Sequence, residues 1–513
     1  MLSVLLECQA PYTEYILSGR KKIETRRYPF PPHLVGKPIW LLETPAGTVG
    51  QSALPNLVEL ALYPHVRILG SIVVSESFQY KSRDEWDRDQ ELHCVPPGSG
   101  YAFQAGHGEW YGWVVSSATT LASPAVTHIS RSYRSFFLPV LPVPTVDISD
   151  PESPQVLDAI AKQCQTLGFL RVSWETFPSD IVSRAHDAMR RFFELDLAAK
   201  ESVSKANLVK TNDSYCPTGY RGVKGMYNGE GRESWSCIRP DYIPGADPFN
   251  SPFYAKGKKY FAQAPDPQVL WPSEALVPGF RDALTAYYAA VEDLGRVLFC
   301  IFARILHLPD PDALLHLARR HASSLNVSHL KPAEDRQDST VVLAPHADIT
   351  CFTILSHDTT SGASGTACLE VLNPARGSLD DPHTVAWLGL ADDASGQPSF
   401  LVNVGQIMER WSNGRLKATL HRVVKPIHES TLQKRRQAMV FFQVADYDAL
   451  LGPMVAGSGE HAWTPERMGD YTESRFAPVA QSRTSVEAAL AYANYNKDVM
   501  SHDEYIQLAT LHA

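Results

Sequence analysis

The sequence predicts an α+β protein whose core is a jelly roll flanked by helices. Between about residues 320 and 445, short runs of β-branched and aromatic residues alternate with turn signals, which is typical of an all-β sandwich or jelly roll. Ahead of this region, apolar residues recur at helical spacing over residues 153–169, 178–196 and 278–308. Residues 1–120 carry a separate group of strand-like runs.

Length and composition indicate an ordinary globular protein. The 513 residues are enough for two or three domains, with 44% hydrophobic and 20% charged residues. A formal net charge of -9 argues against a surface dominated by non-specific attraction to nucleic acid. The 8 cysteines are scattered without a C-x-x-C pair, which favours reduced thiols over a zinc module or a disulfide framework.

The N-terminal run "MLSVLLECQAPY" predicts a first strand. Glu7 ends its apolar part and no basic residue precedes it, unlike a signal peptide. No apolar stretch reaches the roughly 18 residues of a membrane span. We therefore expect a cytoplasmic protein without membrane partners, with the nucleus as the alternative location.

Composition divides the chain into five expected segments. Residues 1–120 are predicted to form a small β domain, and residues 121–143, which are rich in Ser, Thr, Ala and Pro, a linker. Residues 144–260 are a helix and strand region, and residues 261–450 contain the jelly roll. Residues 451–513 form a mixed extension, expected to be helical near residues 485–498.

A histidine and a carboxylate interrupt the apolar run "LAPHADITCFTILSHD". In a strand, His346 and Asp348 project from one face, and His421 in "RLKATLHRVV" can approach from a neighbouring strand. Two imidazoles and one carboxylate are the ligand set of non-haem Fe(II), which leaves positions open for a cosubstrate and O₂. An ion there would also offset the burial of Asp348. The alternative is a chance H-x-D triplet.

Arg436 follows His421 by fifteen positions, again in a strand-like run. It shares a strand face with Ala438 and Val440, and its guanidinium could hold the distal carboxylate of 2-oxoglutarate through two hydrogen bonds. The alternatives are that Arg436 is a surface cation of the run "KRRQ", or that Arg435 takes this role.

These residues lie within motifs that resemble a known family. "VNVGQIMERWSNGRLKATLHRVV", together with "VPTVDIS", "CQTLGF", "AMRRFFELDLAAKE" and "TGY" at 218–220, resembles the isopenicillin N synthase-like Fe(II)/2-oxoglutarate dioxygenases over about residues 142–450. The resemblance implies a distorted double-stranded β-helix that holds one Fe(II). It implies His346, Asp348 and His421 as iron ligands, and Arg436 as the Arg of the family's R-x-S motif.

The sequence also departs from that family. Ala438 stands where the motif has Ser, and the Tyr expected before H-x-D is not evident in "LNVSHLKPA", where His329 or Asn326 could substitute. We assign His329 and Asn403 to the cofactor site with Arg436. The 73 positions from Asp348 to His421 predict an insertion near "SHDTTSGASG" or "ADDASGQPS". Substrate contacts are expected from residues 212–242 and from the C-terminal segment.

The implied activity is oxidation of a C–H bond in an organic substrate. The resemblance implies that this step is coupled to decarboxylation of 2-oxoglutarate to succinate and CO₂, with hydroxylation, demethylation, desaturation or ring closure as outcomes. A small molecule is the expected substrate. An oxidase of the same fold that does not use 2-oxoglutarate is the alternative, because Ala438 removes one hydrogen bond to the cosubstrate.

The segment "LSGRKKIETRRYPF" carries a G-x-x-x-x-E-x-R pattern from Gly19 through Glu24 to Arg26. With the later runs "IWLLET", "ILGSIVV" and "YGWVV", it resembles an ASCH domain, a small β-barrel related to the PUA fold. The resemblance implies binding of RNA or a modified nucleotide. The residues expected to contact it are Lys21, Lys22, Glu24, Arg26 and Arg27.

Two further hypotheses follow from this N-terminal resemblance. The chain could be an oxygenase directed at a nucleobase or nucleic acid, or an RNA-binding protein whose oxygenase-like half is structural. The plain alternative for the charged segment is a solvated turn.

Overall fold

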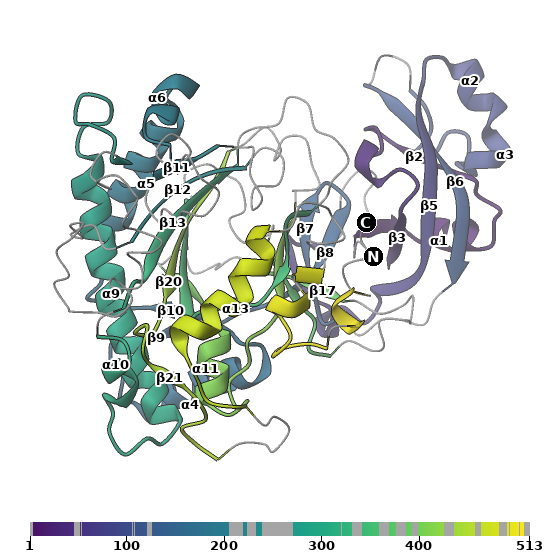
Figure 1. Cartoon of the computed structure of the whole chain (residues 1–513). Coiled ribbons are helices and arrows are strands. Elements are labelled where there is room, and N and C mark those ends of the chain that lie inside the picture. The colour runs from purple at the N-terminus through teal and green to yellow at the C-terminus, as the bar shows by residue number, and fades with distance from the viewer. Residues whose placement is uncertain are drawn as a thin grey trace.

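The computed structural model describes most of the chain from residue 4 to residue 506. Its gaps are residues 46–51, 53, 105, 107, 121–125, 205–218, 223–231, 239–269, 320, 331–340, 359–368, 376–385, 392–398, 425–434, 457–462, 482–489, 492 and 502. The predicted insertions and most of the 212–242 loop fall in these gaps. Two large β-sheets carry the architecture (Figure 1).

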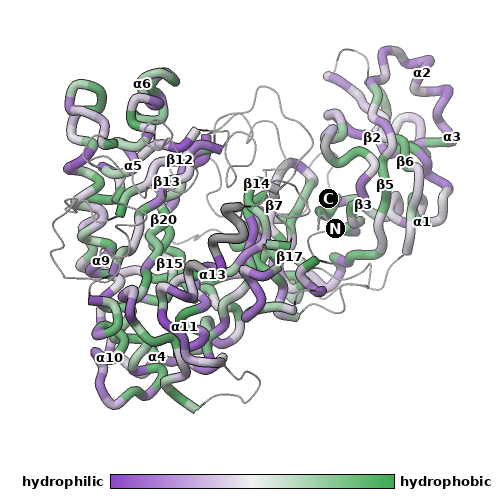
Figure 2. Tube along the Cα trace, viewed as in Figure 1, coloured by the Kyte–Doolittle hydropathy of each residue, from purple (hydrophilic) through white to green (hydrophobic). Residues whose placement is uncertain are grey.

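The first sheet has eight strands, and its neighbouring strands are antiparallel except for the β9–β10 pair. Its spatial order is β11 (Gly219–Arg221), β12 (Arg232–Ile238), β13 (Ser324–Leu330), β20 (Arg436–Gln443), β15 (Phe352–His357), β18 (Phe400–Val404), β10 (Phe169–Ser173) and β9 (Thr145–Asp147). Figure 2 shows hydrophobic residues along the central strands β15 and β20.

Helices cover the outer face of this sheet. They include α4 (Pro154–Thr166), α5 (Ser179–Phe193) and α9 (Phe280–Ile305), each within a predicted helical segment. Helix α9 begins after Gly279, which adopts a positive φ of 69°. Its Phe299 and Phe302 pack against Phe352 of β15, with ring centroids 4.8 and 5.5 Å away.

The second sheet has twelve strands and spans two regions of the chain. The strands β14 (Val341–His346), β19 (His421–Val424), β16 (Leu369–Leu372) and β17 (Trp387–Leu390) form the second layer of the jelly roll. The other strands are β8 (Phe136–Leu141), β1 (Leu5–Gln9), β3 (Pro38–Thr44), β5 (Arg67–Tyr80), β6 (Trp110–Thr120), β2 (Ile23–Arg26), β7 (His128–Tyr133) and β4 (Leu57–Glu59). The predicted α+β class with a jelly-roll core is confirmed.

The prediction of a linker over residues 121–143 is wrong for residues 128–141. Strand β8 pairs antiparallel with β1, where Leu5 faces Phe137, and parallel with β17, where Gly389 faces Val140. The apolar run "FFLPVL" is therefore a strand at the junction of the N-terminal strands and the jelly roll. Its partners are distant in sequence, so the local Pro-rich composition was misleading.

A hydrophobic cluster joins these two regions. Trp40, Leu42 and Val58 of the N-terminal region pack with Val371 and Leu388 of the jelly roll, and all five are buried. Residues 1–141 therefore complete the core of the oxygenase-like region.

The remaining elements complete the described structure. They are helices α1 (Tyr12–Leu17), α2 (Arg83–Arg88), α3 (Gln90–His93), α6 (Leu197–Ser202), α10 (Ala313–His316), α11 (Gln406–Trp411) and α13 (Met468–Gln481), the 3-10 turns Pro32–Leu34 and Leu60–Leu62, and strands β21 (Leu450–Leu451) and β22 (Glu466–Arg467). The helix predicted near residues 485–498 falls partly in the gaps, and residues 493–495 are helical. Among the described residues, no helix is both long and apolar enough to cross a bilayer.

Deleting residues 1–141 should destabilise the remainder of the chain. The deletion exposes the apolar side chains of the jelly roll that pack against Trp40, Leu42 and Val58. Each large apolar side chain exposed to water lowers the free energy of unfolding by about 1.5–3 kcal/mol. A typical protein has a total free energy of unfolding of only about 5–15 kcal/mol. We expect a fragment of residues 142–513 to aggregate, or to melt well below the full chain when followed by circular dichroism. A fragment that melts at the temperature of the full chain would contradict the shared core.

Candidate metal centre

Strands β14 and β19 bring the two predicted histidines together. His346 ends β14, His421 begins β19, and the two residues face each other directly in the antiparallel pairing, with ring centroids 4.4 Å apart. One ligand atom from each of His346, Asp348 and His421 lies within 4.8 Å of the other two. In the described part of the chain, this is the cluster of side chains that could hold a metal ion.

Asp348 reaches the cluster in a different way from the one predicted. The run that was expected to be one strand is two strands, β14 and β15, and Asp348 lies in the turn between them. Its Oδ2 atom accepts hydrogen bonds from Thr353 Oγ1 at 2.6 Å and from Asn403 Nδ2 at 2.8 Å. Its Oδ1 atom lies 3.5 Å from His346 Nε2 and 3.8 Å from His421 Nε2.

Backbone carbonyls fix both imidazoles. His346 Nδ1 lies 2.8 Å from the carbonyl oxygen of Ala344, and His421 Nδ1 lies 3.2 Å from that of Thr419. Each Nδ1–H donates to its carbonyl, which leaves the Nε2 lone pair directed at the cluster. Burial, followed by the neighbouring His346, lowers the pKa of His421 to about 4. His421 is therefore neutral at physiological pH, as metal coordination requires.

Asp348 is a buried carboxylate at 4% exposure. Burial alone would raise its pKa, but the rings of His421 and His346 and the amide of Asn403 bring the pKa below its usual range. An ionised carboxylate in this setting needs a compensating positive charge. Two imidazole nitrogens and one carboxylate oxygen on one side of the site fit Fe(II), with the remaining positions open.

Residues from later in the chain hold the backbone of this turn. The amide of Ala347 donates to Asn496 Oδ1 at 2.9 Å, and its carbonyl accepts from Gln406 Nε2 at 2.7 Å. Tyr505 donates its hydroxyl to the carbonyl of Pro345 at 2.8 Å. No local pattern in the sequence indicates these contacts, because they join segments up to 160 positions apart.

Arg436 is the first residue of β20 and is 8% exposed. Thr353 of β15, which contacts Asp348, pairs with Phe442 of β20. Because side chains alternate along a strand, Arg436 lies on the same inner face of the sheet as Phe442. Arg435 points away to an ion pair with Glu194 at 2.7 Å, so it does not compete for the inner face.

The assignment of His329 to the cofactor site is wrong. His329 lies on the outer face of β13, stacked on Phe193 of α5 at 4.6 Å, and its Nδ1 is 3.0 Å from Glu233 Oε1. Burial would raise the pKa of Glu233, but hydrogen bonds from His329, Tyr220 and Lys200 lower it to about 2. His329 is thus a structural partner of a buried carboxylate.

Asn403, the other residue predicted for the cofactor site beside Arg436, and Asn326, the possible substitute for the family's Tyr, both lie on the inner face of the sheet. Asn403 contacts Asp348 directly, so its place in the structure is beside the metal ligand. Asn326 pairs with Val440 and shares the inner face of the sheet with Arg436.

The basic residues of the N-terminal segment are mostly used inside the fold. Lys21 is 2% exposed, with Nζ 2.5 Å from the carbonyl of His93 and 3.5 Å from Glu24 Oε2. Arg26 Nε pairs with Glu24 Oε1 at 2.8 Å, which forms the predicted Glu24–Arg26 pair. Lys21, Glu24 and Arg26 are therefore not phosphate contacts, whereas Lys22 is exposed.

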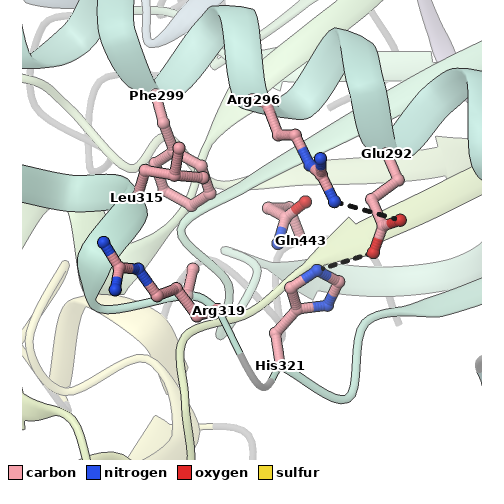
Figure 3. Close-up of a pocket in the computed structure, with 8 residues that line it drawn as sticks. Glu292, Arg296, Phe299, Leu315, Arg319, His321 and Gln443 are labelled. Atoms are coloured by element: carbon pink, nitrogen blue, oxygen red, sulfur yellow. Dashed lines mark ion pairs between the residues drawn. The ribbon is translucent and has the colours of Figure 1, made fainter. Parts of the chain in front are cut away.

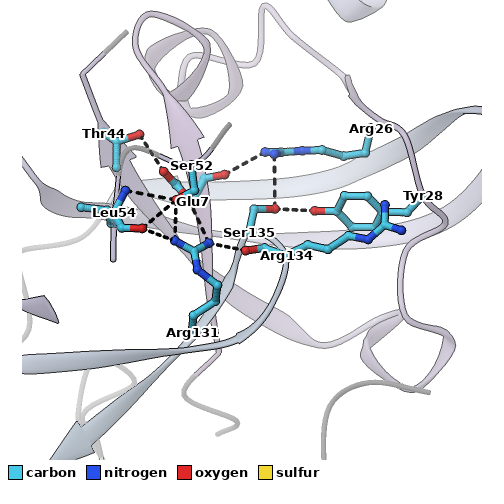
Figure 4. A network of polar contacts seen from close by, with 9 residues as sticks. All are labelled: Glu7, Arg26, Tyr28, Thr44, Ser52, Leu54, Arg131, Arg134 and Ser135. Atoms are coloured by element: carbon cyan, nitrogen blue, oxygen red, sulfur yellow. Dashed lines mark hydrogen bonds and ion pairs between the residues drawn. The ribbon is translucent and has the colours of Figure 1, made fainter. Parts of the chain in front are cut away.

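Arg26 also ties its strand to the turn between β7 and β8 (Figure 4). Its guanidinium donates to the carbonyl of Glu7 at 2.8 Å and to Ser135 Oγ at 3.3 Å, and the Tyr28 hydroxyl is hydrogen-bonded to the same Ser135. The conspicuous charged motif thus has a structural role here.

A cavity of about 230 Å³ lies between α9, α10 and β20 (Figure 3). It sits on the helical side of the eight-stranded sheet, and an ion pair of 2.9 Å joins its His321 and Glu292. Its lining residues are Glu292, Arg296, Phe299, Leu315, Ala318, Arg319, His321 and Gln443. The metal cluster lies on the other face of the sheet, so this cavity is not part of it.

Two family models match the chain. Residues 143–255 match the N-terminal region of non-haem dioxygenases described for morphine synthesis, and residues 321–444 match the 2OG-Fe(II) oxygenase superfamily. The second match contains all three candidate ligands and Arg436. Neither match includes residues 1–142.

Curated relatives and a solved structure agree with these matches. Flavonol synthase/flavanone 3-hydroxylase of Arabidopsis thaliana is 26% identical over 373 residues, 71% of this chain and 93% of the relative. A 2-oxoglutarate-dependent dioxygenase of Talaromyces stipitatus, tropC, is 24% identical, over 65% of this chain and 94% of the relative. The crystal structure of a full-length Neurospora crassa protein in complex with α-ketoglutarate aligns with a TM-score of 0.50 at 19% identity, over 65% of this chain and 95% of the Neurospora chain. The family matches and the named relatives indicate a 2-oxoglutarate-dependent dioxygenase, an oxidoreductase.

Replacing Asn403 with Ala should weaken iron binding without unfolding the protein. The change removes the amide that orients Asp348 Oδ2, and losses of such supporting hydrogen bonds cost roughly 10–100-fold in metal affinity. Competition with a chromophoric chelator under anaerobic conditions measures the effect. Asn373→Ala, which removes another buried amide that caps its own turn at Ala375, should leave the iron affinity unchanged. Equal affinities for Asn403→Ala and the wild type would show that Asn403 does not orient the ligand.

Proposed function

We propose that the protein oxidises a C–H bond of a small organic molecule, with His346, Asp348 and His421 as the iron ligands and Arg436 as the anchor of 2-oxoglutarate. The observation that carries this proposal is the cluster of His346, Asp348 and His421 beside a sheet face that also holds Arg436. The bound iron and 2-oxoglutarate would supply O₂ activation, coupled to decarboxylation to succinate and CO₂.

The protein's own residues position and shield the reacting groups. Thr353 and Asn403 hold one oxygen of Asp348, so that the other faces the two histidines. Phe169 packs against His421 in a T-shaped arrangement with ring centroids 5.5 Å apart, and both residues are buried. The guanidinium of Arg436 matches a carboxylate in geometry and charge, and suits the distal end of 2-oxoglutarate.

The relatives support a small-molecule substrate. The name of the Arabidopsis thaliana relative describes hydroxylation of a flavanone, and 93% of its length aligns with this chain. Hydroxylation is accordingly the first outcome to test, followed by demethylation, desaturation and ring closure. An oxidase that does not use 2-oxoglutarate is the second candidate, because Ala438 lacks the hydroxyl of the R-x-S motif.

Turnover of 2-oxoglutarate without substrate tests the proposal. Iron-loaded protein incubated with labelled 2-oxoglutarate and O₂ should release succinate slowly, and His346→Ala should release none. Arg436→Leu should raise the KM for 2-oxoglutarate at least about tenfold, because it removes a charged hydrogen-bonding partner. Wild-type protein that binds iron but neither binds nor converts 2-oxoglutarate would favour the oxidase.

We also propose that residues 1–120 form an ASCH-like module, related to the PUA β-barrel, that presents RNA or a modified nucleotide. Support comes from the G-x-x-x-x-E-x-R motif and from its Glu24–Arg26 pair. The candidate contacts that stay at the surface are Lys22 and Arg27, and the Arg27 guanidinium lies 3.8 Å from the ring of Trp110.

Binding of a fluorescent single-stranded RNA to the full chain tests this module. We expect weak, salt-sensitive binding that falls when Lys22 and Arg27 are changed to Glu, because phosphate contacts depend on charge and ionic strength. Glu43→Lys and Lys37→Glu together form a charge-neutral control in the same region. Binding that does not respond to salt or to the Lys22 and Arg27 changes would contradict the proposal.

A further inference from the structure

A second basic side chain, His357, lies on the inner face of the eight-stranded sheet near Arg436. His357 is the last residue of β15 and pairs directly with Ala438 of β20, two positions after Arg436. The neighbouring Ser356 points to the helical side, where its hydroxyl is 2.9 Å from His186 Nε2 of α5. Because side chains alternate along a strand, His357 points to the inner face, as Thr353 does.

The ring of His357 is buried without a hydrogen bond. Both ring nitrogens are shielded from solvent, and neither has a hydrogen-bond partner among the described residues. Buried polar atoms in folded proteins are normally hydrogen-bonded, so an exception calls for an explanation. A bound ligand that completes the hydrogen bonds is one explanation that the location supports.

The surroundings of His357 are positively charged. Burial, and then the charges of Arg436 and Arg171, lower the pKa of His357 well below its usual value. Arg171 of β10 is 5% exposed and donates to the carbonyl of Ala391 at 3.0 Å. His357 is therefore a neutral imidazole with one N–H to donate, in a region that attracts an anion.

Because position 438 is an alanine, the distal carboxylate of 2-oxoglutarate lacks one hydrogen-bond donor beside Arg436. In the R-x-S motif, a hydroxyl two positions after the Arg contacts the same carboxylate, and Ala438 has none. Ala438 has a neighbour on each side, His357 of β15 and Ser328 of β13. The Ser328 hydroxyl accepts a hydrogen bond from Arg232 Nε at 2.9 Å and keeps its own O–H to donate, whereas neither nitrogen of the His357 ring has a hydrogen-bond partner among the described residues.

We propose that His357 donates a ring N–H to the distal carboxylate of 2-oxoglutarate, beside Arg436, and so takes the place of the hydroxyl that Ala438 lacks. This inference rests on the proposed use of 2-oxoglutarate. It makes His357 a cosubstrate-binding residue that selects for a second carboxylate, with no part in holding the iron.

Binding measurements on iron-loaded, oxygen-free protein test the proposal without turnover. By calorimetry, His357→Ala should bind 2-oxoglutarate about tenfold or more weakly than the wild type, as expected for a lost hydrogen bond to a charged group. Its affinity for 2-oxobutanoate, which lacks the distal carboxylate, should not change. His357→Gln, which keeps a donor, should retain part of the affinity.

The motif hydroxyl provides a rescue. In the His357→Ala background, Ala438→Ser restores a donor on the adjacent strand and should recover most of the affinity for 2-oxoglutarate. The matched control is His329→Ala, which removes a buried histidine from the outer face of the same sheet. It should lower the melting temperature but leave the affinity for 2-oxoglutarate unchanged.

Three outcomes would overturn the proposal. If Arg436→Leu weakens 2-oxoglutarate binding and His357→Ala does not, the role of His357 is refuted and the proposed function stands. If Ser328→Ala produces the loss instead, the second donor is Ser328. If His357→Ala weakens 2-oxobutanoate and 2-oxoglutarate equally, the ring only supports local structure. Wild-type protein that binds no 2-oxoglutarate would refute the proposed function itself.

Discussion

The site depends on one electrostatic constraint, the burial of the Asp348 carboxylate beside the imidazoles of His346 and His421. A charge in that place requires a positive partner, and the surrounding structure directs one carboxylate oxygen and two Nε2 atoms at a common point. Thr353 and Asn403 occupy the other oxygen. Hydrogen bonds with Gln406, Asn496 and Tyr505 hold the backbone at Ala347 and Pro345, just before Asp348. Segments nearer the C-terminus therefore help to position this ligand.

The metal ligands could be predicted from the sequence because two of them, His346 and Asp348, form a recognisable pattern at short spacing. His346, Asp348 and His421 could be named from the H-x-D pattern and from the resemblance, and the jelly roll from its short apolar runs. The predicted position of Asp348 on the same strand face as His346 was wrong. Asp348 lies in the turn after β14, and hydrogen bonds from Thr353 of β15 and Asn403 of β18 orient its carboxylate. A sequence pattern does not show where an apolar run breaks into two strands.

The predictions from sequence were wrong where pairing with distant segments or burial of a side chain determined the structure. His329 was placed in the cofactor site, although it is an odd number of positions from Asn326 and so faces the helices, where Glu233 pairs with it. The segment of residues 128–141 resembled a linker in composition, but strands β1 and β17 bind it on its two sides. Lys21 and Arg26 resembled surface cations in the sequence, but both pair with Glu24 inside the fold.

Anomalous diffraction at the iron absorption edge is the most direct test of the central claim. Crystals grown without oxygen in the presence of Fe(II) should give one strong peak between His346 Nε2, His421 Nε2 and Asp348 Oδ1, and the peak should be absent from His346→Ala crystals. No peak at that point in the wild type, or a peak bound by other residues, would contradict the account.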